Sequence, residues 1–266
     1  MTICLETIRK EIKEQCRSNK ELLDQASGYC DKISKLGILD RSCSLYINDS
    51  DVILGTIEKY MESLCVEYSK KFSGITNETI SFDLLCMDNL FNNDVRHQTI
   101  DEIIDNLPLE KWKTEFLSRC EKLEDVGLYK SAKELLNFFR LWERERATGN
   151  IDPIKKSGGY EYETSLYKDT WGSGYAYNCK DNYRNIIEHL GVFAKDTGIE
   201  SLHTRFLSIL DLISKERNTF DSRTVLYQDG IAKSVVFNGK MKHVLTNEES
   251  DALIAFIKTH HKDYLS

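Results

Sequence analysis

Three side chains within one short stretch of the chain have the types needed for chemistry on a phosphodiester bond. They are Arg184, Asn185 and His189. A neutral imidazole, with a pKa near ~6.5, can take or give a proton at cellular pH, and a positioned general acid or base contributes ~10²–10⁴-fold to a rate. Arginine is always cationic and its planar fork matches phosphate oxygens, while an amide can orient a phosphate, a nucleophile or an imidazole. The residue types therefore suit a site that binds a phosphate ester and moves protons on it.

The apolar residues around these three side chains predict a helix. At 100° per residue, Asn185 and His189 share one face of that helix. Arg184 lies more than about 100° around the helix from His189. Its guanidinium reaches the imidazole if its side chain curls inward, if the helix starts irregularly, or if a second subunit completes the site. The apolar stripe on the other side consists of Tyr183, Ile186, Ile187, Leu190 and Ala194.

The text RNIIEHLG, from Arg184 to Gly191, resembles the R-polar-x3-H signature of the HEPN superfamily. The resemblance implies a helical bundle that dimerises so that two motifs face a shared cleft. It further implies a metal-independent endoribonuclease with Arg184, Asn185 and His189 as catalytic positions, the 2′-hydroxyl of RNA as nucleophile, a cyclic phosphate as product, and no cofactor. Such enzymes act in toxin–antitoxin, abortive-infection and CRISPR-associated defence systems. The implied partners are RNA, a second copy of the chain and an antitoxin or defence protein.

A second hypothesis is a non-catalytic helical interaction protein, such as an inhibitor, an antitoxin or an assembly subunit. Arg184 would then form a surface ion pair with Glu188, and His189 would be an interfacial or capping residue. The superfamily that the motif resembles also contains members that only bind or dimerise. Some of its toxins carry a modifiable tyrosine two residues after the histidine; Gly191 stands there, so silencing by adenylylation at that position is not expected.

A stretch rich in Gly, Ser and Tyr, from Thr148 to Gly174, precedes the motif and reads as a long loop. Loops of that length in compact proteins are usually functional or mobile. Aromatic rings there can stack on bases of single-stranded RNA at ~1–3 kcal/mol per base, or they can anchor the loop on the core. A lysine can hold the RNA backbone or simply face solvent. The candidate substrate-binding residues are Trp171, Tyr175, Tyr177 and Lys180.

The rest of the chain predicts a mainly α fold, because it has two prolines and long runs rich in Leu, Ile, Glu and Lys. Two further helical stretches are expected between Glu110 and Arg146, with a break near Gly127. The resemblance makes the expected architecture a HEPN-like bundle. The other expected helices cover Leu5–Leu36 (as one helix or two), Asp51–Phe72, Thr79–Phe91, Thr99–Leu107 before Pro108, and Gly198–Lys215.

Alternating apolar and polar residues first appear near the C-terminus, in Thr224–Tyr227, Ser234–Phe237 and Lys240–Leu245. The dipeptides Asp-Gly and Asn-Gly between these runs are two-residue turn signals, so we expect a three-stranded β-meander. A Thr-x-x-Glu capping box at Thr246 then predicts a final helix. We expect one HEPN-like domain over residues 1–266, with N-terminal helices in 1–45, a helical core in 46–220, and the meander and final helix in 221–266.

Composition excludes several classes of protein. No apolar run approaches the ~20 residues of a membrane helix, and the charged start of the chain does not resemble a secretion signal. The eight cysteines form no CxxC pair, which predicts reduced core thiols in the cytoplasm rather than a zinc or disulfide framework. A net charge of −7 argues against a broad basic face for duplex nucleic acid. A small phosphate-directed site remains compatible with that charge.

Overall fold

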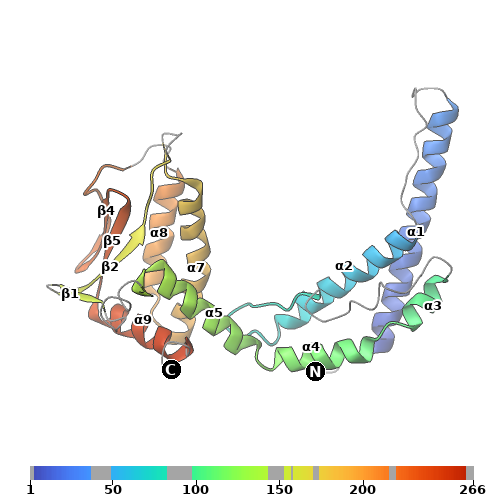
Figure 1. Ribbon diagram of the computed structural model, residues 1–266, viewed down its shortest axis with the longest axis horizontal. Helices are drawn as coiled ribbons and strands as arrows, with labels where there is room; N and C mark the ends of the chain where they lie inside the picture. The colour runs from blue at the N-terminus through green and yellow to red at the C-terminus, as the bar shows by residue number, and fades with distance from the viewer. Residues whose placement is uncertain are drawn as a thin grey trace. The chain divides into compact units, whose positions relative to one another are not determined.

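The computed structural model describes residues 3–36, 49–82, 98–142, 153–156, 158–169, 174–215 and 220–261. The chain divides into two compact units, an N-terminal unit, Met1–Glu124, and a C-terminal unit, Asp125–Ser266. The described residues are mainly helical, as the sequence predicts, with eight helices and five strands (Figure 1). The boundary between the two units, after Glu124, falls inside the range 46–220 that we expected to form the helical core. The expected organisation as one HEPN-like domain stays a prediction.

The described residues of the N-terminal unit form four helices: α1 (Leu5–Lys35), α2 (Asp49–Ser69), α3 (Ile100–Asp105) and α4 (Leu109–Cys120). Residues 5–35 form one helix, which decides between the two expected alternatives. At the other end of the unit, Pro108 separates α3 from α4, as predicted, and Thr99 starts α3 with a capping box. The expected helix over Thr79–Phe91 is absent at residues 79–81, and residues 83–91 lie outside the described residues.

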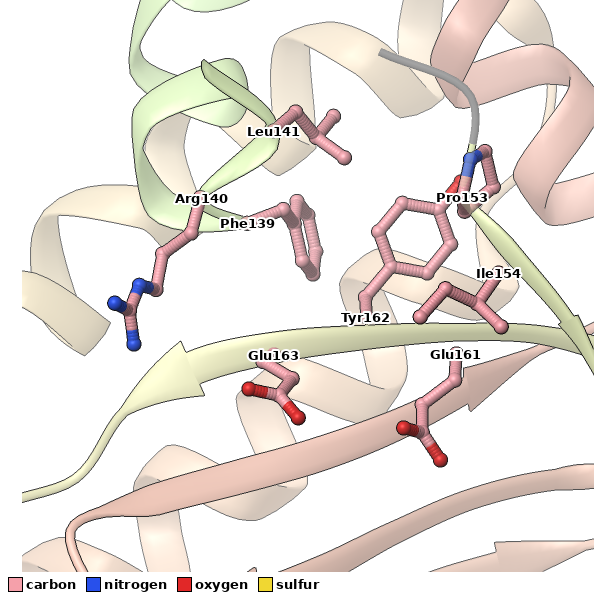
Figure 2. Close-up of a pocket in the computed structure, with 8 residues that line it drawn as sticks. All are labelled: Phe139, Arg140, Leu141, Pro153, Ile154, Glu161, Tyr162 and Glu163. Carbon is pink, nitrogen blue, oxygen red and sulfur yellow. The ribbon is translucent and has the colours of Figure 1, made fainter. Parts of the chain in front are cut away.

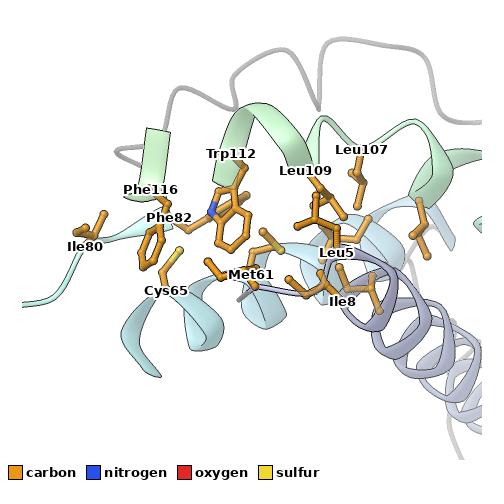
Figure 3. Close-up of a cluster of buried hydrophobic side chains, with 14 of the residues drawn as sticks. Leu5, Ile8, Met61, Cys65, Ile80, Phe82, Leu107, Leu109, Trp112 and Phe116 are labelled. Carbon is orange, nitrogen blue, oxygen red and sulfur yellow. The ribbon is translucent and has the colours of Figure 1, made fainter. Parts of the chain in front are cut away.

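The core of the N-terminal unit is apolar. Figure 3 shows Trp112 and Phe116 of α4 beside Met61 and Cys65 of α2. The two aromatic rings stack with their centroids 5.4 Å apart. Their spacing of four residues places both on one face of α4, and both side chains are fully buried.

Helix α5 (Leu123–Phe138) corrects the predicted break near Gly127. Gly127 lies inside α5 and is buried, and the break falls at Glu121–Lys122 instead. A glycine inside a helix costs only about 1 kcal/mol, which the burial of Leu128, Leu135 and neighbouring side chains outweighs. The helix ends at Phe138 and residues 141–142 are helical again; the predicted end near Arg146 is not tested, because residues 143–146 lie outside the described residues.

The C-terminal unit holds one antiparallel five-stranded sheet in the order β1-β2-β5-β4-β3. The predicted meander is confirmed: its turns contain Gly230 and Gly239, both at positive φ (54° and 76°). The expected three strands, however, are only part of the sheet, because β2 pairs with β5 over its whole length. The strands are β1 (Ile154–Lys156), β2 (Gly159–Ser165), β3 (Val225–Asp229), β4 (Ala232–Phe237) and β5 (Lys240–Leu245).

Strands β1 and β2 therefore replace much of the expected long loop between Thr148 and Gly174. Side chains along β2 alternate, with Tyr162 and Thr164 buried and Glu161 and Glu163 half-buried on the other face. At Gly159, an added Cβ would come 2.3 Å from the backbone oxygen of Leu245, so only glycine lets the two strands approach there. The sequence of a short polar strand with few β-branched residues resembles that of a loop, and only its pairing partner shows that it is a strand.

Three helices complete the C-terminal unit: α7 (Tyr177–Thr197), α8 (Ser201–Lys215) and α9 (Asn247–His260). Helices α7 and α8 lie side by side next to the sheet (Figure 1). The capping box at Thr246 and Glu249 starts α9, as predicted. Within the described residues, no helix combines the length and apolar character needed to cross a membrane.

Candidate active site on helix α7

Helix α7 carries the motif and is amphipathic in the predicted way. Tyr183, Ile186 and Leu190 are buried on its inner face, and Ile187 is half-buried. Gly198, in the left-handed conformation at φ 76°, ends the helix and returns its N–H to the carbonyl of Ala194. The stripe of apolar contacts fixes the rotation of α7 about its axis, and this rotation decides where the polar residues point.

Asn185 and His189 lie one turn apart on the side of α7 away from the stripe. The side chain of Asn185 is exposed, while His189 is half-buried. His189 Nδ1 lies 3.1 Å from Oγ of Ser131, a buried residue of α5. The hydroxyl either donates to a bare Nδ1 or accepts from a protonated one, so this contact restrains the ring and couples its tautomer to the orientation of the hydroxyl.

Arg184 points away from the histidine. Its guanidinium is about half exposed (49%) and donates to the carboxylate of Asp181 over 2.8 Å. The partner is the residue one turn earlier, and not Glu188 as the interaction-protein hypothesis expects. The described part of α7 begins at Tyr177, so an irregular helix start at Arg184 is ruled out as the way to bring the three groups together.

The four candidate substrate-binding residues occupy different environments. Tyr175 is buried and its hydroxyl accepts a hydrogen bond from the backbone N–H of Phe220 (2.8 Å), so its ring anchors the segment before α7. Tyr177 begins α7 and is 76% exposed. Lys180, one turn later, is half-buried. Trp171 lies outside the described residues.

The sequence alone did not identify the buried polar side chains of the C-terminal unit. His243 of β5 is fully buried and bonded at both ring nitrogens, to Ser234 Oγ at Nδ1 and to Thr164 Oγ1 at Nε2, each over 2.9 Å. Burial, together with the nearby charge of Arg205, lowers the pKa of His243 to about 3. Strand alternation places His243 on the face of Met241 and Leu245, which was the available signal for its burial.

Arg205 of α8 and Glu249 of α9 form a buried ion pair in the same unit. The Nη2 of Arg205 lies 2.6 Å from both carboxylate oxygens, and its Nη1 donates to the carbonyl of Val244. Glu249 also accepts from Ser201 Oγ and from the backbone N–H of Thr246. These contacts tie α8, α9 and β5 together, and we assign them to the stability of the unit.

A cavity of about 290 Å³ lies where β1 begins, beside the part of β2 that β1 does not cover (Figure 2). Phe139 and Tyr162 meet edge to face at its centre, with Glu161 and Glu163 on β2 below them. The carboxylates already pair with Lys242 and Lys240, each over 2.8 Å. Although burial favours a higher pKa for Glu163, the two lysines lower it below the ordinary value. No residue of α7 lines this cavity, so it is separate from the motif.

No group of three or more His, Cys, Asp or Glu side chains is placed to hold a metal ion in the part of the chain that the structure describes. Comparison with protein-family models, with curated proteins and with solved structures finds no match to this chain. The evidence about function therefore consists of the motif on α7 and the residues that surround it.

Proposed function

We propose that this protein is a metal-independent HEPN-type endoribonuclease that acts as a homodimer, in the cytoplasm, as a toxin or antiphage effector. One observation carries the proposal. Asn185 and His189 lie one turn apart on the side of α7 away from its apolar stripe; Asn185 is exposed, and the half-buried imidazole of His189 is held by Ser131 from a second helix. An oriented imidazole beside an exposed amide is suited to proton transfer on a bound phosphodiester.

His189 is assigned the proton transfers. In the proposed reaction the 2′-oxygen of RNA bonds to phosphorus, and the bond from phosphorus to the 5′-oxygen breaks. The 2′-hydroxyl loses a proton and the leaving 5′-oxygen gains one, so the products are a cyclic phosphate and a 5′-hydroxyl. Asn185 is assigned the positioning of the phosphate or of the attacking hydroxyl, because its amide offers both donors and an acceptor.

Arg184 is assigned the stabilisation of charge on the phosphate. To do this it must exchange Asp181 for a phosphate oxygen. Exposed ion pairs are worth only about 0.2–1 kcal/mol, so a bidentate phosphate contact can displace this one. Since Arg184 and His189 point in different directions on one helix, we propose that Arg184 of one copy completes the site of the other.

Tyr177 and Lys180 are the proposed RNA contacts nearest the motif. Both lie on the first turn of α7, before Arg184, and the ring of Tyr177 is largely open to solvent. A stacked base contributes about 1–3 kcal/mol, so one exposed ring gives modest, sequence-tolerant affinity. Tyr175 supports this turn from the inside, and the role of Trp171 stays a prediction.

A second candidate function is that of a non-catalytic interaction protein, and the ion pair between Arg184 and Asp181 favours it. A guanidinium held by a neighbouring carboxylate is an ordinary surface feature of a helix. In this case α7 presents an exposed polar face to a partner protein, and His189 serves as a positioned surface residue bonded to Ser131.

The two functions differ in an RNA cleavage assay carried out in a metal chelator. We expect structured RNA to be cut by the wild type, leaving cyclic phosphate ends, and cleavage to fall at least about 10²-fold in His189→Ala and in Arg184→Ala. Ser131→Ala should reduce cleavage less, because it loosens the imidazole without removing it.

Matched controls exist elsewhere on the chain. Arg119→Ala removes an exposed arginine that pairs with Glu115 one turn away, and His260→Ala removes a surface histidine that contacts Asp196. Both should cleave like the wild type. Cleavage that survives His189→Ala and Arg184→Ala would reject the site. No cleavage by any form, with no growth arrest on expression, would support the interaction protein.

A further inference from the structure

Uncharged residues follow one face of α1 along its whole length. They recur at spacings of three and four residues, the heptad pattern, beginning with Leu5, Ile8 and Ile12. These first three are buried in the core of the N-terminal unit. Gln15 and Asn19 continue the same face, which we call the α1 stripe. The first part of the stripe therefore has a known partner, namely the core of its own unit.

The second part of the stripe extends beyond α2. Asp49, the first residue of α2, pairs with Lys20 over 2.8 Å, and Asn19 donates to Thr56 Oγ1 over 2.9 Å. The fifteen residues of α1 after Lys20, about 22 Å of helix, therefore lie past the start of α2 (Figure 1). This part exposes large apolar side chains, Leu22 by 59%, Tyr29 by 64% and Ile33 by 38%, and Leu36, directly after α1, is 70% exposed.

A groove of about 560 Å³ lies where α2 begins beside α1. Gln15, Asn19 and Leu22 of the stripe line one wall, and α2 supplies the other wall around Gly55. A Cβ added at Gly55 would meet nothing within 4 Å, so the groove is open at that point. Between residues 15 and 36, the α1 stripe thus offers a groove near its start and protruding side chains toward its end.

We propose that two copies of the chain associate through residues 15–36, the last part of α1 with Leu36 after it, packed antiparallel about a two-fold axis at Ala26. Tyr29, Ile33 and Leu36 follow Ala26 by 3, 7 and 10 residues, while Leu22, Asn19 and Gln15 precede it by 4, 7 and 11. The axis therefore sets Tyr29, Ile33 and Leu36 opposite groove residues of the other copy. Ala26 is small, which lets the two helices approach closely where they cross.

A second copy fits this surface better than a partner of different chemistry. The positions that flank the stripe between 15 and 36 are uncharged, with the exception of Lys32. Its ammonium lies 5.5 Å from the ring centroid of Tyr29 on the same helix. The groove wall on α2 adds one charge of each sign, Asp51 and Lys59. The surface thus carries no excess of negative charge, although the whole chain carries −7. An interface between identical patches is the commonest type in soluble oligomers, and 22 residues give a contact about 33 Å long.

Sedimentation of the full chain across a range of concentrations tests the association. We expect a dimer whose fraction rises with concentration, and a Kd weakened on the order of 100-fold by Leu22→Glu, which buries a carboxylate opposite Tyr29 of the other copy. Adding Tyr29→Lys to Leu22→Glu should restore most of the affinity, because the antiparallel register sets the two new charges against each other. Leu22→Glu with Tyr29→Glu should stay monomeric.

Leu207→Glu is the matched control, since Leu207 is an exposed leucine (43%) on α8 of the other unit. It should leave the Kd unchanged, and the helix content of every variant should equal that of the wild type, because the substituted side chains are exposed. A monomeric wild type at 100 µM would overturn the proposal, as would a dimer that survives Leu22→Glu with Tyr29→Glu. This association would supply the homodimer of the proposed nuclease, but sedimentation measures it without RNA, so its result does not depend on whether the site on α7 cleaves.

Discussion

The core of the N-terminal unit is built mainly from aliphatic, thiol and aromatic side chains, with buried hydroxyls such as those of Ser69 and Ser73, whereas the core of the C-terminal unit also encloses an imidazole and an ion pair. In the first, Ile57, Met61 and Phe116 pack without a hydrogen bond between them. In the second, the hydroxyl of Tyr183 bonds Thr164, which bonds His243. Apolar cores tolerate repacking at constant volume, while buried polar chains need one geometry. The polar core thereby restrains how α7 lies against the sheet.

The thiols of the N-terminal unit behave as small apolar side chains. Burial raises the pKa of Cys16 to about 11 and that of Cys65 to about 12. Both thiols therefore stay protonated at cellular pH and have little tendency to react. This agrees with the expectation of reduced core thiols. Neither Cys16 nor Cys65 is therefore a titrating group comparable to His243.

Removing one partner of the buried ion pair should produce the largest loss of stability. Glu249→Gln keeps the shape and an acceptor oxygen but leaves the charge of Arg205 unpaired, so we expect the C-terminal unit to lose about 3–5 kcal/mol. Urea unfolding followed by hydrogen exchange, read separately for the two units, measures the change. The matched control is Asp211→Asn, which breaks the exposed pair with Lys215 and should cost less than about 1 kcal/mol.

A cavity in the apolar core should cost nearly as much, but in the other unit. Met61 is fully buried beside Trp112, so Met61→Ala removes side-chain contacts and should destabilise the N-terminal unit by about 2–5 kcal/mol. The same exchange experiment should show unchanged protection in α7, α8 and β5. Equal losses in both units would show that they unfold together, which would weaken the contrast between their cores.

Mild acid should destabilise the C-terminal unit through His243. Its pKa is near 6.5 when unfolded and about 3 when folded, so the unfolded chain binds an extra proton between these values. Stability is then full above pH 6.5 and falls by about 1.4 kcal/mol per unit below it, about 2 kcal/mol at pH 5. Urea midpoints at pH 7 and pH 5 measure this. His243→Gln, whose amide can still hydrogen-bond both hydroxyls, should not lose stability between pH 7 and pH 5. An equal loss in this variant would show that His243 is not its cause.

The smallest expected effects come from the two capping boxes, one in each unit. Thr99→Ala and Thr246→Ala each remove a hydroxyl that caps a helix, at a cost of about 1 kcal/mol. The effect of Thr99→Ala should appear in the N-terminal unit and that of Thr246→Ala in the C-terminal unit. A loss above 3 kcal/mol for Thr246→Ala would mean that the cap also holds Glu249 in its pair with Arg205.

Local signals predicted many of the elements. Helical periodicity identified α1 and α2, the Asp-Gly and Asn-Gly turns identified the meander, and both the capping box at Thr246 and the stop before Pro108 were found at their positions. Each of these depends on residues within about one or two turns of each other. The amphipathic helix around Arg184, Asn185 and His189 was predictable for the same reason.

Contacts between distant residues were not predictable. β2 becomes a strand by pairing with β5, some eighty residues later, and Gly127 stays helical because of what packs against α5. Ser131 carried no signal in the sequence that linked it to His189, 58 residues away. The direction of Arg184 toward Asp181, rather than Glu188, was one of several rotamers that the sequence leaves open.

The amino-acid sequence by itself determined which side chains of α7 face inward and which face outward, because helical period and apolar spacing are local properties. Only the tertiary structure decided what those outward groups touch. The imidazole of His189 meets a hydroxyl from α5, and the guanidinium of Arg184 stays on the surface. Such pairings depend on how separate elements pack, and packing is set by the whole buried surface rather than by any one segment.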